Sequence, residues 1–368
     1  MKYDVIIAGA GLAGSVAART FADAGRKVMV VEQHRHVAGH CHDYRDDAGI
    51  TVHTYGPHIF HTTDKAVWDF ANRFTEFHYL QHRVLSYAGG KLVPFPVNRD
   101  TINEVFGVSI ATGEVDAFLA NEVDRSKFNS PSKNFRDAVV CQVGERLYEL
   151  FYKNYTLKQW ERDPETLSPE IAKRIPVRSN RDDRYFSDRY QGVPKRGYTR
   201  FIENMLDHVN VSVMLGADFF EVAPHFDAPL TVFTGELDKY FGQKHGALAY
   251  RSLDIRFETL DQERFQAAPV VNYPNDYDWT RITEFKQLSG ETSAKTTICY
   301  EFPKEKGEPF YIVDDAENMA KRDRYMAEVK VVESDGKVIF VGRLAEYKYY
   351  NMDQVIGATL KKVLPLVK

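Results

Sequence analysis

The sequence predicts an α/β fold built around a discontinuous, Rossmann-like nucleotide-binding domain, with a helical insertion domain and an antiparallel-sheet domain. Three observations support this prediction. At the N-terminus a β-branched run, a glycine-rich turn and a helix-forming stretch follow one another. Near the C-terminus a strand, a turn and a helix recur, and between them helical and strand-like patterns occupy different stretches of the 368 residues. We expect a chain of this length to divide into two or three domains.

The N-terminal fingerprint lies in the stretch DVIIAGAGLAG, where a short β-branched run enters a glycine-rich turn and a helix follows. Gly9 permits the tight turn, Gly11 lets a pyrophosphate approach the backbone, and Gly14 lets the helix pack closely on the strand. A second strand, KVMVVE, ends in Glu32, at the distance where an acidic side chain binds a ribose hydroxyl. Together these features predict a dinucleotide-binding unit with the phosphates at a helix N-terminus.

The segment after Glu32 favours FAD over NAD as the dinucleotide. Its sequence, QHRHVAGHCHDY, resembles the second glycine-containing segment of FAD enzymes of the glutathione-reductase type, and Gly39 stands where that family keeps a glycine. We therefore expect an FAD-binding domain. With a flavin present, the cofactor carries the chemistry and the protein supplies binding and electrostatics.

Histidines and cysteines give no pattern of a metal site or a disulfide. Four histidines flank Cys41 on one irregular stretch, and this spacing matches no usual zinc motif. We predict that they lie in solvent or face phosphate beside the cofactor, and that the protein binds no metal. The residues concerned are His34, His36, His40 and His42. The three cysteines are scattered, which fits a reducing compartment without a structural disulfide.

Charge and hydropathy exclude several classes of partner. The net charge is −4 and the pI is about 6.3, so we expect no nucleic-acid or membrane-surface binding, and any anionic ligand must be held by local arginines. No apolar run approaches the length of a membrane span, and the first residues lack a signal-peptide pattern. We expect a cytoplasmic protein. GxSxG, HExxH and CxxC motifs are absent from the sequence, which disfavours acyl-transfer and zinc-hydrolase chemistry.

Patterning along the chain gives an expected division into three domains. The stretch 130–160 has aromatic and aliphatic residues at helical spacing, and 210–300 contains short β-branched runs. The terminal stretch KVIFVGRLAEYKYYNMDQVIGATLKKVL reads as strand, turn and helix, so the nucleotide-binding sheet is completed from the C-terminus. The expected FAD-binding domain is 1–75 with about 205–240 and 330–368, the helical domain about 76–180, and the sheet domain about 181–204 with 241–329.

Six motifs carry a resemblance to a known family over nearly the whole chain. They are, in order, YGPHIFHT, LYELFYKNYTLKQW, KRIPVR, DDRYFSDRYQGVPKRGYT, WTRITEF and VGRLAEYKYYNMD. The chain resembles bacterial UDP-galactopyranose mutases. The resemblance implies a flavoenzyme that interconverts UDP-galactopyranose and UDP-galactofuranose, with N5 of reduced FAD as nucleophile at the anomeric carbon and with no net redox change.

The same resemblance assigns charged and flavin-facing residues. Arg174 and Arg281 match the two diphosphate-binding arginines of the family, whose guanidinium groups stabilise the departing diphosphate. His58, in YGPH, lies on the loop beside the flavin ring, where an imidazole responds to protonation of N5. We count these three as catalytic. The remaining residues expected to contact the cofactor are His61, Arg343 and Met352.

Aromatic residues in the matched motifs form the expected substrate site. Tyr155 and Trp160 resemble the platform on which the uracil base stacks, and Phe151 lies one turn earlier on the same helix. Tyr185, Tyr311 and Tyr349 correspond to family tyrosines around the phosphates and the sugar. Asn351 is expected to contact the sugar as well.

Departures from the family pattern leave the identity of the sugar open. Asn351 replaces a family aspartate, Ala38-Gly39-His40 replaces a GGN sequence, and Trp279 and Phe310 replace tyrosines. One lost carboxylate changes which substituents a sugar site tolerates. UDP-N-acetylgalactose and a dTDP-deoxysugar are therefore alternative substrates. Two further classes of protein share the same fingerprint and stay open, namely an FAD oxidoreductase of the amine-oxidase or glutathione-reductase type and a non-catalytic FAD-binding protein.

The stretch ERDPETLSPEIAKRIPVR, residues 161–178, is expected to be a lid that closes over the substrate. Its three prolines disfavour a single rigid helix, and Arg174 lies within it. A segment that grips the diphosphate and excludes water must close when substrate binds. The family also implies an external reductant such as NAD(P)H and a homodimer.

Overall fold

The structure is a computed structural model that describes residues 2–123 and 132–367, apart from the side chains of Lys173 and Arg174. Among these residues, five parallel strands form one sheet with the order β10-β2-β1-β11-β17. They come from three separate stretches of the chain, as expected for a discontinuous nucleotide-binding fold. Their bounds are Val5–Ala8 (β1), Val28–Glu32 (β2), Val211–Leu215 (β10), Leu230–Phe233 (β11) and Val338–Phe340 (β17).

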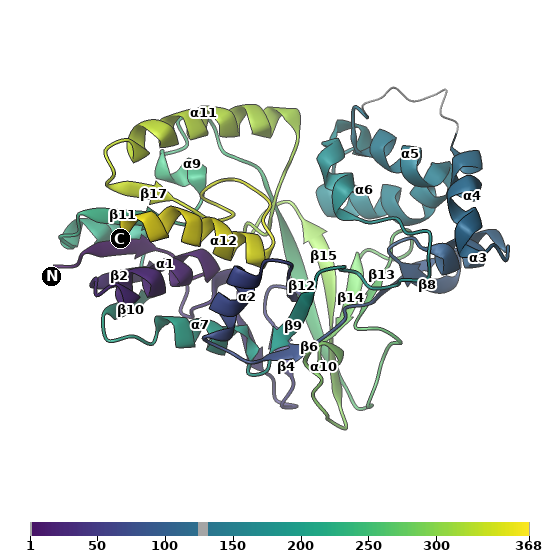
Figure 1. Cartoon of the computed structure of the whole chain (residues 1–368), viewed down its shortest axis with the longest axis horizontal. Coiled ribbons are helices and arrows are strands. Elements are labelled where there is room, and N and C mark those ends of the chain that lie inside the picture. The colour runs from purple at the N-terminus through teal and green to yellow at the C-terminus, as the bar shows by residue number, and fades with distance from the viewer. Residues whose placement is uncertain (1, 124–131, 368) are drawn as a thin grey trace.

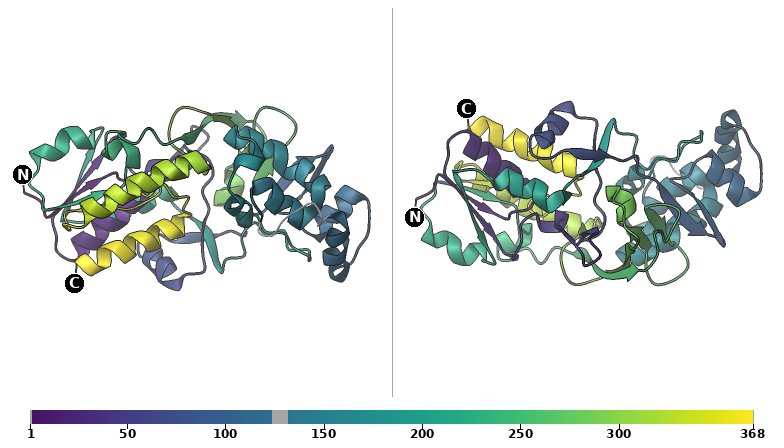
Figure 2. Two further views of the ribbon diagram at one scale, coloured as in Figure 1. Left: turned by 90° about the horizontal axis from the view of Figure 1, so that it is seen from above. Right: turned by 90° about the horizontal axis from the view of Figure 1, so that it is seen from below.

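Helices cover both faces of the parallel sheet because its strand residues alternate in direction (Figures 1 and 2). Val232 and Ile339 belong to the core under one set of helices, and the adjacent Phe233 and Phe340 belong to the core on the opposite face. The first face carries α1 (Leu12–Asp23), α7 (Gly197–Leu206) and α12 (Met352–Val363). The second carries α9 (Leu237–Tyr240) and α11 (Ala316–Glu333).

A large, mostly antiparallel sheet lies beside the nucleotide-binding fold (Figure 1). Its order is β16-β12-β15-β14-β13-β7-β8, and among the described strands of this sheet only β13 and β7 pair in parallel. Two of these strands, β7 and β8, come from the range that we expected to be helical, so the range 76–180 also contributes to this sheet. The bounds are Val84–Ala88 (β7), Lys91–Phe95 (β8), Tyr250–Leu260 (β12), Val270–Asn272 (β13), Arg281–Glu284 (β14), Thr296–Lys304 (β15) and Tyr311–Ile312 (β16).

The helical part packs around an apolar core at the far end of the molecule, to which β7, β8 and β13 of the large sheet also contribute (Figure 1). The expected helical stretch 130–160, whose residues 130 and 131 lie outside the described residues, includes α5 (Phe135–Tyr148), a π-helical turn (Glu149–Lys153) and α6 (Asn154–Trp160). The other helices here are α3 (Arg99–Phe106) and α4 (Val115–Glu122). Within the described residues, no helix is both long and apolar enough to cross a bilayer.

Smaller elements connect these parts. A small sheet joins β5 (Phe60–Thr62), β9 (Tyr190–Pro194) and β6 (Phe77–Tyr79), and β3 (Asp43–Arg45) pairs with β4 (Thr51–His53). The short helices are α2 (Lys65–Asn72), α8 (Phe219–Val222) and α10 (Lys286–Ser289), with short 3-10 helices at Gly39–Cys41, Thr112–Glu114, Pro164–Thr166, Pro169–Arg174, Ala223–His225 and Leu364–Leu366.

Close packing of α1 on β1 requires glycine in the N-terminal turn. Gly9 has a φ of +99°, and a Cβ placed on Gly14 would lie 1.9 Å from the carbonyl oxygen of Gly9. The third glycine of the fingerprint therefore lets the helix begin directly against the strand that precedes it.

We predict that Gly14→Ala lowers the free energy of unfolding by about 1–3 kcal/mol, because the added methyl group forces the backbone of the turn apart. Denaturant unfolding of the variant measures this. Gly113→Ala is the matched control, since no atom beyond its chain neighbours lies within 4 Å of its added Cβ. An unfolding free energy equal to that of the parent protein would show that the turn relaxes without cost.

Candidate functional site

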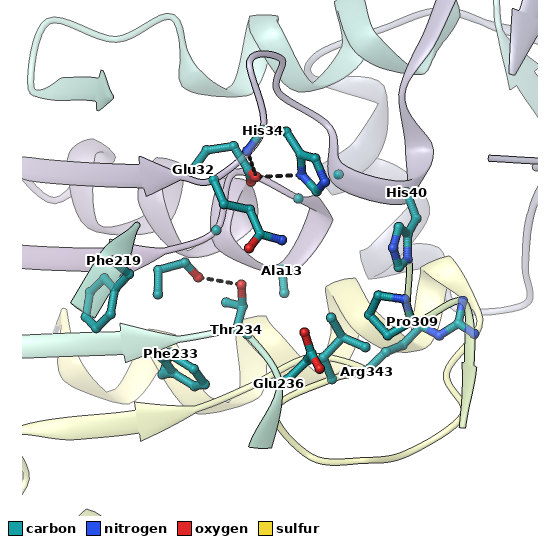
Figure 3. A pocket seen from close by; sticks show the side chains of 18 of the residues that line it. Ala13, Glu32, His34, His40, Phe219, Phe233, Thr234, Glu236, Pro309 and Arg343 are labelled. Atoms are coloured by element: carbon teal, nitrogen blue, oxygen red, sulfur yellow. Dashed lines mark hydrogen bonds and ion pairs between the residues drawn. The ribbon is translucent and has the colours of Figure 1, made fainter. Parts of the chain in front are cut away.

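A cavity of about 560 Å³ opens at the carboxyl edge of the parallel sheet (Figure 3). The ends of β1, β2 and β11 line it, together with the loop that follows β17. Ligands of open α/β sheets bind at this edge. Of the predicted cofactor residues, the cavity is lined by Gly9, Gly11, Glu32, Gly39, Arg343 and Met352, and His58, predicted as catalytic, lines it too.

The glycines form a narrow backbone cradle at the start of α1. A Cβ on Gly39 would lie 3.2 Å from Cα of Gly11, and a Cβ on Gly9 would lie 2.4 Å from Oγ1 of Thr234. The first turn of α1 contains no acidic residue, and Gly11, Leu12 and Ala13 at its start line the cavity. Backbone N–H groups at a helix N-terminus bind phosphate. These residues therefore fit a dinucleotide whose pyrophosphate lies at the start of α1.

Glu32 is buried at the end of β2 and is held by hydrogen bonds. Its carboxylate accepts from the N–H of Ala10 at 2.7 Å, and from the N–H and Nδ1 of His34 at 2.8 and 2.9 Å. Burial raises the pKa of Glu32, but the hydrogen bonds from His34 and Ala10 outweigh burial and bring it below its ordinary value. The carboxylate is ionised and faces the cavity, as a ribose-binding acid requires.

His34 joins the nucleotide-binding fold to the large sheet's β15–β16 loop. Its Nε2 lies 3.1 Å from Glu308, while its Nδ1 contacts Glu32. Hydrogen bonds from Glu308 and Glu32 raise the pKa of His34 to about 10, so the imidazole is a cation between two carboxylates. His40 lies 3.7 Å from Glu308 and stacks on Phe310.

The other histidines of this loop bind hydroxyl groups. His36 Nε2 lies 2.9 Å from the hydroxyl of Tyr55, and His42 Nδ1 lies 2.7 Å from that of Thr54. Across residues 2–123 and 132–367, no three histidine, cysteine, aspartate or glutamate side chains are arranged to hold a metal ion.

His58 is a neutral imidazole at the cavity wall. Burial lowers its pKa to about 3, with further contributions from His53 and Arg343. Its Nδ1 lies 2.8 Å from the carbonyl oxygen of Gly56. Because a carbonyl only accepts, Nδ1 carries the proton and Nε2 is an acceptor. His58, which lines the cavity, is therefore a neutral imidazole whose Nε2 can accept a hydrogen bond.

The predicted substrate residues gather around Arg281, the first residue of β14. Arg281 Nε donates to the buried carboxylate of Glu301 at 2.8 Å, and its NH2 donates to the hydroxyl of Tyr311 at 3.2 Å. The second carboxylate oxygen of Glu301 has no hydrogen-bond partner among the described residues. The ion pair with Glu301 therefore orients the guanidinium group without using all of its donors.

Aromatic rings connect Arg281 to the cofactor cavity. Tyr311 stacks on Tyr349 with ring centroids 6.1 Å apart, and Trp160 meets Tyr311 edge-on at 6.1 Å. The guanidinium of Arg343, a cavity residue, lies 4.8 Å from the ring centroid of Tyr349. Arg343 is therefore the link between the cavity and the tyrosine cluster.

Tyr155 and Tyr185 also lie close enough to this cluster to interact electrostatically with it. Burial raises the pKa of Tyr155 to about 12, opposed by the positive charge of Arg281, and Tyr185 and Tyr349 are among the groups that influence it. The structure thus brings together most of the predicted substrate residues, which lie far apart in the sequence.

Several predicted residues lie outside these two groups. Phe151 packs in the helical core with Phe95 at 5.9 Å. His61 pairs with Asp188 at 2.9 Å and stacks on Phe186 at 3.7 Å, and it does not line the cavity. Gly14 supports helix packing, as described above. The roles assigned to Phe151 and His61 stay predictions.

The last predicted residues lie at the start of α12 and in the expected lid. Asn351 is the N-cap of α12, and its N–H donates to Gln354 at 2.9 Å. In segment 161–178, Leu167 forms a β-bridge with Asp315, and the N–H of Ser168 donates to the carbonyl of Asp314 at 3.3 Å. The side chain of Arg174 lies outside the described residues, so its role and the lid stay predictions.

Sequence reasoning missed several residues that line the cavity. Thr234 follows β11, and its hydroxyl donates to the carbonyl of Ala8 at 2.5 Å. Thr234 could have been predicted from the sequence, because the residue that follows a parallel strand beside β1 lies at the carboxyl edge of the sheet, as Gly9 does. Phe219 and Lys239 flank it, and Glu308 comes from the large sheet. Glu308 had no local signal, since only the tertiary fold brings it to His34.

Comparisons with known proteins agree with this arrangement. A family model described as UDP-galactopyranose mutase matches residues 150–349, and one described as NAD(P)-binding Rossmann-like domain matches residues 7–74. The chain is 36% identical to a probable UDP-galactopyranose mutase of Klebsiella pneumoniae, over 97% of this chain and 93% of the relative. It is 33% identical to a dTDP-fucopyranose mutase of Escherichia coli, over 97% of this chain and 96% of that one.

Solved structures share the fold. A crystal structure of reduced UDP-galactopyranose mutase superposes with a TM-score of 0.76 at 16% identity, covering 99% of this chain and 96% of that chain. Wild-type putrescine oxidase bound to putrescine superposes with a TM-score of 0.59 at 12% identity, covering 100% of this chain and 99% of that one.

Buried neutral histidines make the fold sensitive to acid. His82 is 4% exposed, and burial together with the charge of Arg281 lowers its pKa to about 3. Burial likewise lowers the pKa of His53 to about 4. In the unfolded chain a histidine titrates near 6.5, so the unfolded state binds more protons below that pH. The stabilisation by the neutral form is present above pH 6.5 and is lost as the pH falls toward 3.

Between pH 6 and 4 the free energy of unfolding falls as the pH falls. We predict that His82→Phe reduces the slope of this dependence by at most about 1.4 kcal/mol per pH unit, because it removes one histidine that is protonated only in the unfolded state. Denaturant unfolding at several pH values measures this slope. His225→Gln, at an exposed histidine, serves as the control. If the unfolding free energies of His82→Phe and of the parent protein have the same slope against pH, the pKa of His82 is the same in the folded and unfolded states, which would contradict the prediction.

Proposed function

We propose, because this chain belongs to the UDP-galactopyranose mutase family, that it interconverts UDP-galactopyranose and UDP-galactofuranose with reduced FAD as its cofactor. The observation that carries the proposal is the connection of two sites through Arg343. One site is a cavity that fits a dinucleotide, and the other holds Arg281 among tyrosines. A mutase of this type needs a cofactor ring beside an anion site that releases and rebinds the diphosphate.

Residues of the cavity fit FAD in distinct roles. Gly9, Gly11 and Gly39 leave room for a pyrophosphate, and the ionised Glu32 is an acceptor for ribose hydroxyl groups. Bound in its reduced form, FAD supplies a nucleophilic N5 for attack on an anomeric carbon without net redox change. His58 lines the same cavity and stays neutral, so its unprotonated Nε2 can accept a hydrogen bond.

Arg281 is suited to hold the diphosphate while it is detached from the sugar. A guanidinium has five N–H donors, and among the described residues Arg281 uses Nε for Glu301 and NH2 for Tyr311. The plane of the group is therefore set before a ligand arrives, and donors are left for phosphate oxygens. Preorganised charge of this kind stabilises a leaving group without reorganisation. Arg174 is proposed as the second arginine, on a lid formed by residues 161–178.

The aromatic residues suit the nucleoside and the sugar. Tyr155 and Trp160 lie on α6 and offer ring faces to a pyrimidine base, while Tyr185, Tyr311 and Tyr349 offer hydroxyl groups. The reduced cofactor requires an external electron donor such as NAD(P)H. A homodimer is the proposed assembly.

A second candidate substrate is a dTDP-linked deoxysugar. The relative named dTDP-fucopyranose mutase matches the chain almost as well as the probable UDP-galactopyranose mutase of Klebsiella pneumoniae. Asn351, at the start of α12, carries no charge where an aspartate is expected. The reaction class is the same for both sugars, so the choice between them rests on relative rates.

We predict that enzyme reduced with dithionite converts UDP-galactofuranose to UDP-galactopyranose, and that air-oxidised enzyme does not, because only reduced N5 is nucleophilic. Chromatography of the sugar nucleotides measures conversion, and the flavin absorbance of the protein measures its redox state. A parallel incubation with dTDP-fucofuranose decides between the two substrates. Consumption of reductant in proportion to product would identify an oxidoreductase instead, and equal rates in air without reductant would contradict the proposed chemistry.

We predict that Arg281→Ala lowers kcat/KM by about 10²–10³-fold and leaves the flavin content unchanged, because one preorganised donor group to the leaving diphosphate is lost. Steady-state kinetics and flavin absorbance measure the two effects. Arg256→Ala is the control, since Arg256 is exposed and pairs with Asp254 at 2.8 Å. Near-normal turnover of Arg281→Ala would remove Arg281 from the diphosphate site.

A further inference from the structure

Lys158 lies on α6 and binds three main-chain carbonyls of the loop between β13 and β14. Its Nζ lies 2.8 Å from the carbonyl oxygen of Tyr273, 2.9 Å from that of Asp276 and 3.4 Å from that of Trp279. An ammonium group has three donors and no acceptor, so this arrangement can use its full donor capacity. Lys158 thereby ties a helix of the helical part to a loop of the large sheet.

The loop that Lys158 holds leads directly into Arg281. Trp279 precedes Arg281 by two residues, and the N–H of the intervening Thr280 donates to the carbonyl of Glu301 at 2.9 Å. The loop is closed at its base, where the N–H of Tyr273 donates to the carbonyl of Thr280 at 2.8 Å. A displacement of the loop therefore moves the backbone from which the guanidinium of Arg281 extends.

The helix that carries Lys158 also carries the aromatic residues proposed for the base. Tyr155 precedes Lys158 by three residues and therefore lies near it on the helix surface, and Trp160 ends the same helix. A further hydrogen bond between α6 and this loop lies one turn earlier, where Asn154 Nδ2 donates to the side-chain oxygen of Asn275 at 2.9 Å. The same short helix thus carries the rings proposed for the base and is hydrogen-bonded to the loop that leads into Arg281.

We propose that Lys158 is a positioning residue that sets the separation between the nucleobase platform on α6 and the diphosphate-binding Arg281. This inference rests on the proposed function, which assigns the diphosphate to Arg281. A nucleoside diphosphate has a fixed reach from base to phosphate, so it binds tightly only when the two parts of its site are held at matching distance. A ligand that lacks the phosphates needs only the platform.

The surroundings of Lys158 differ from those of a solvent-facing lysine on the same stretch of helix. Burial lowers the pKa of Lys158, and the carboxylates of Asp276 and Asp278 act in the opposite direction. Lys153, one turn earlier on the chain, instead pairs with Glu149 of its own helix at 2.7 Å and is partly exposed. The two lysines differ in whether they reach the loop, which makes Lys153 a matched control.

The test measures binding of UDP and of uridine to the purified flavoprotein by calorimetry. We expect Lys158→Met to weaken UDP binding on the order of tenfold, less than the about hundredfold effect that a 1 Å displacement of reacting groups can have. We expect uridine binding to change less than about twofold, and Lys158→Arg to recover most of the UDP affinity because it restores donors to the loop. Lys153→Met should bind both ligands like the parent.

A double-mutant cycle separates this role from general support of the fold. In the Arg281→Ala background, Lys158→Met should have little further effect on UDP binding, since Lys158 acts through Arg281. Additive losses, or equal losses of UDP and uridine affinity, would overturn the proposal. If Lys158→Met binds UDP normally while Arg281→Ala binds it weakly, the role of Lys158 is overturned and the diphosphate site at Arg281 stands. If Arg281→Ala binds UDP normally, the assignment of the diphosphate to Arg281 is overturned, and the role of Lys158 falls with it. If Lys158→Met does not fold, Lys158→Gln carries the same test.

Discussion

The parallel pairing of β1 with β2 on one side and with β11 on the other is the constraint on which the rest of the molecule depends. Each strand delivers its following residue to the same edge, so Gly9, Glu32 and Thr234 meet although they come from distant parts of the chain. The pairing of β11 with β17 then places the loop with Arg343 beside them. The strand order therefore determines which residues the parallel sheet contributes to the cavity.

Charge in the site is arranged in two different ways. In the cavity, His58 is neutral, and the cation His34 is balanced by Glu32 and Glu308. In the tyrosine cluster, Arg281 is balanced by Glu301, which has no exposed surface. Such a pair is costly to bury unless the remaining donors find partners. In the proposed function an anionic ligand at Arg281 supplies them, so the ion pair that orients the guanidinium also favours a charged ligand.

Local sequence patterns were sufficient to predict the elements that depend on neighbouring residues. The glycine turn, the acid at the end of β2 and the return of a strand and a helix at the C-terminus all have short-range signals, and the structure has each of them. Long-range pairing had no such signal. The addition of β7 and β8 to the large sheet, the contact of Glu308 with His34 and the reach of Lys158 to three carbonyls all depend on segments about 100 or more residues apart. The aromatic residues around Arg281 were identified through a family resemblance, because singly each would read as core.

The discontinuity of the parallel sheet also sets the order in which the chain can fold during synthesis. Val5 pairs with Leu230, and Thr231 pairs with Val338, so the N-terminal strands are made long before their partners leave the ribosome. Until then one edge of β1 is unpaired and its apolar residues lack their cover of helices such as α12. Contacts of such large sequence separation form slowly because loop closure precedes any gain from pairing. Until β11 has been made, the unpaired edge of β1 is therefore exposed to aggregation.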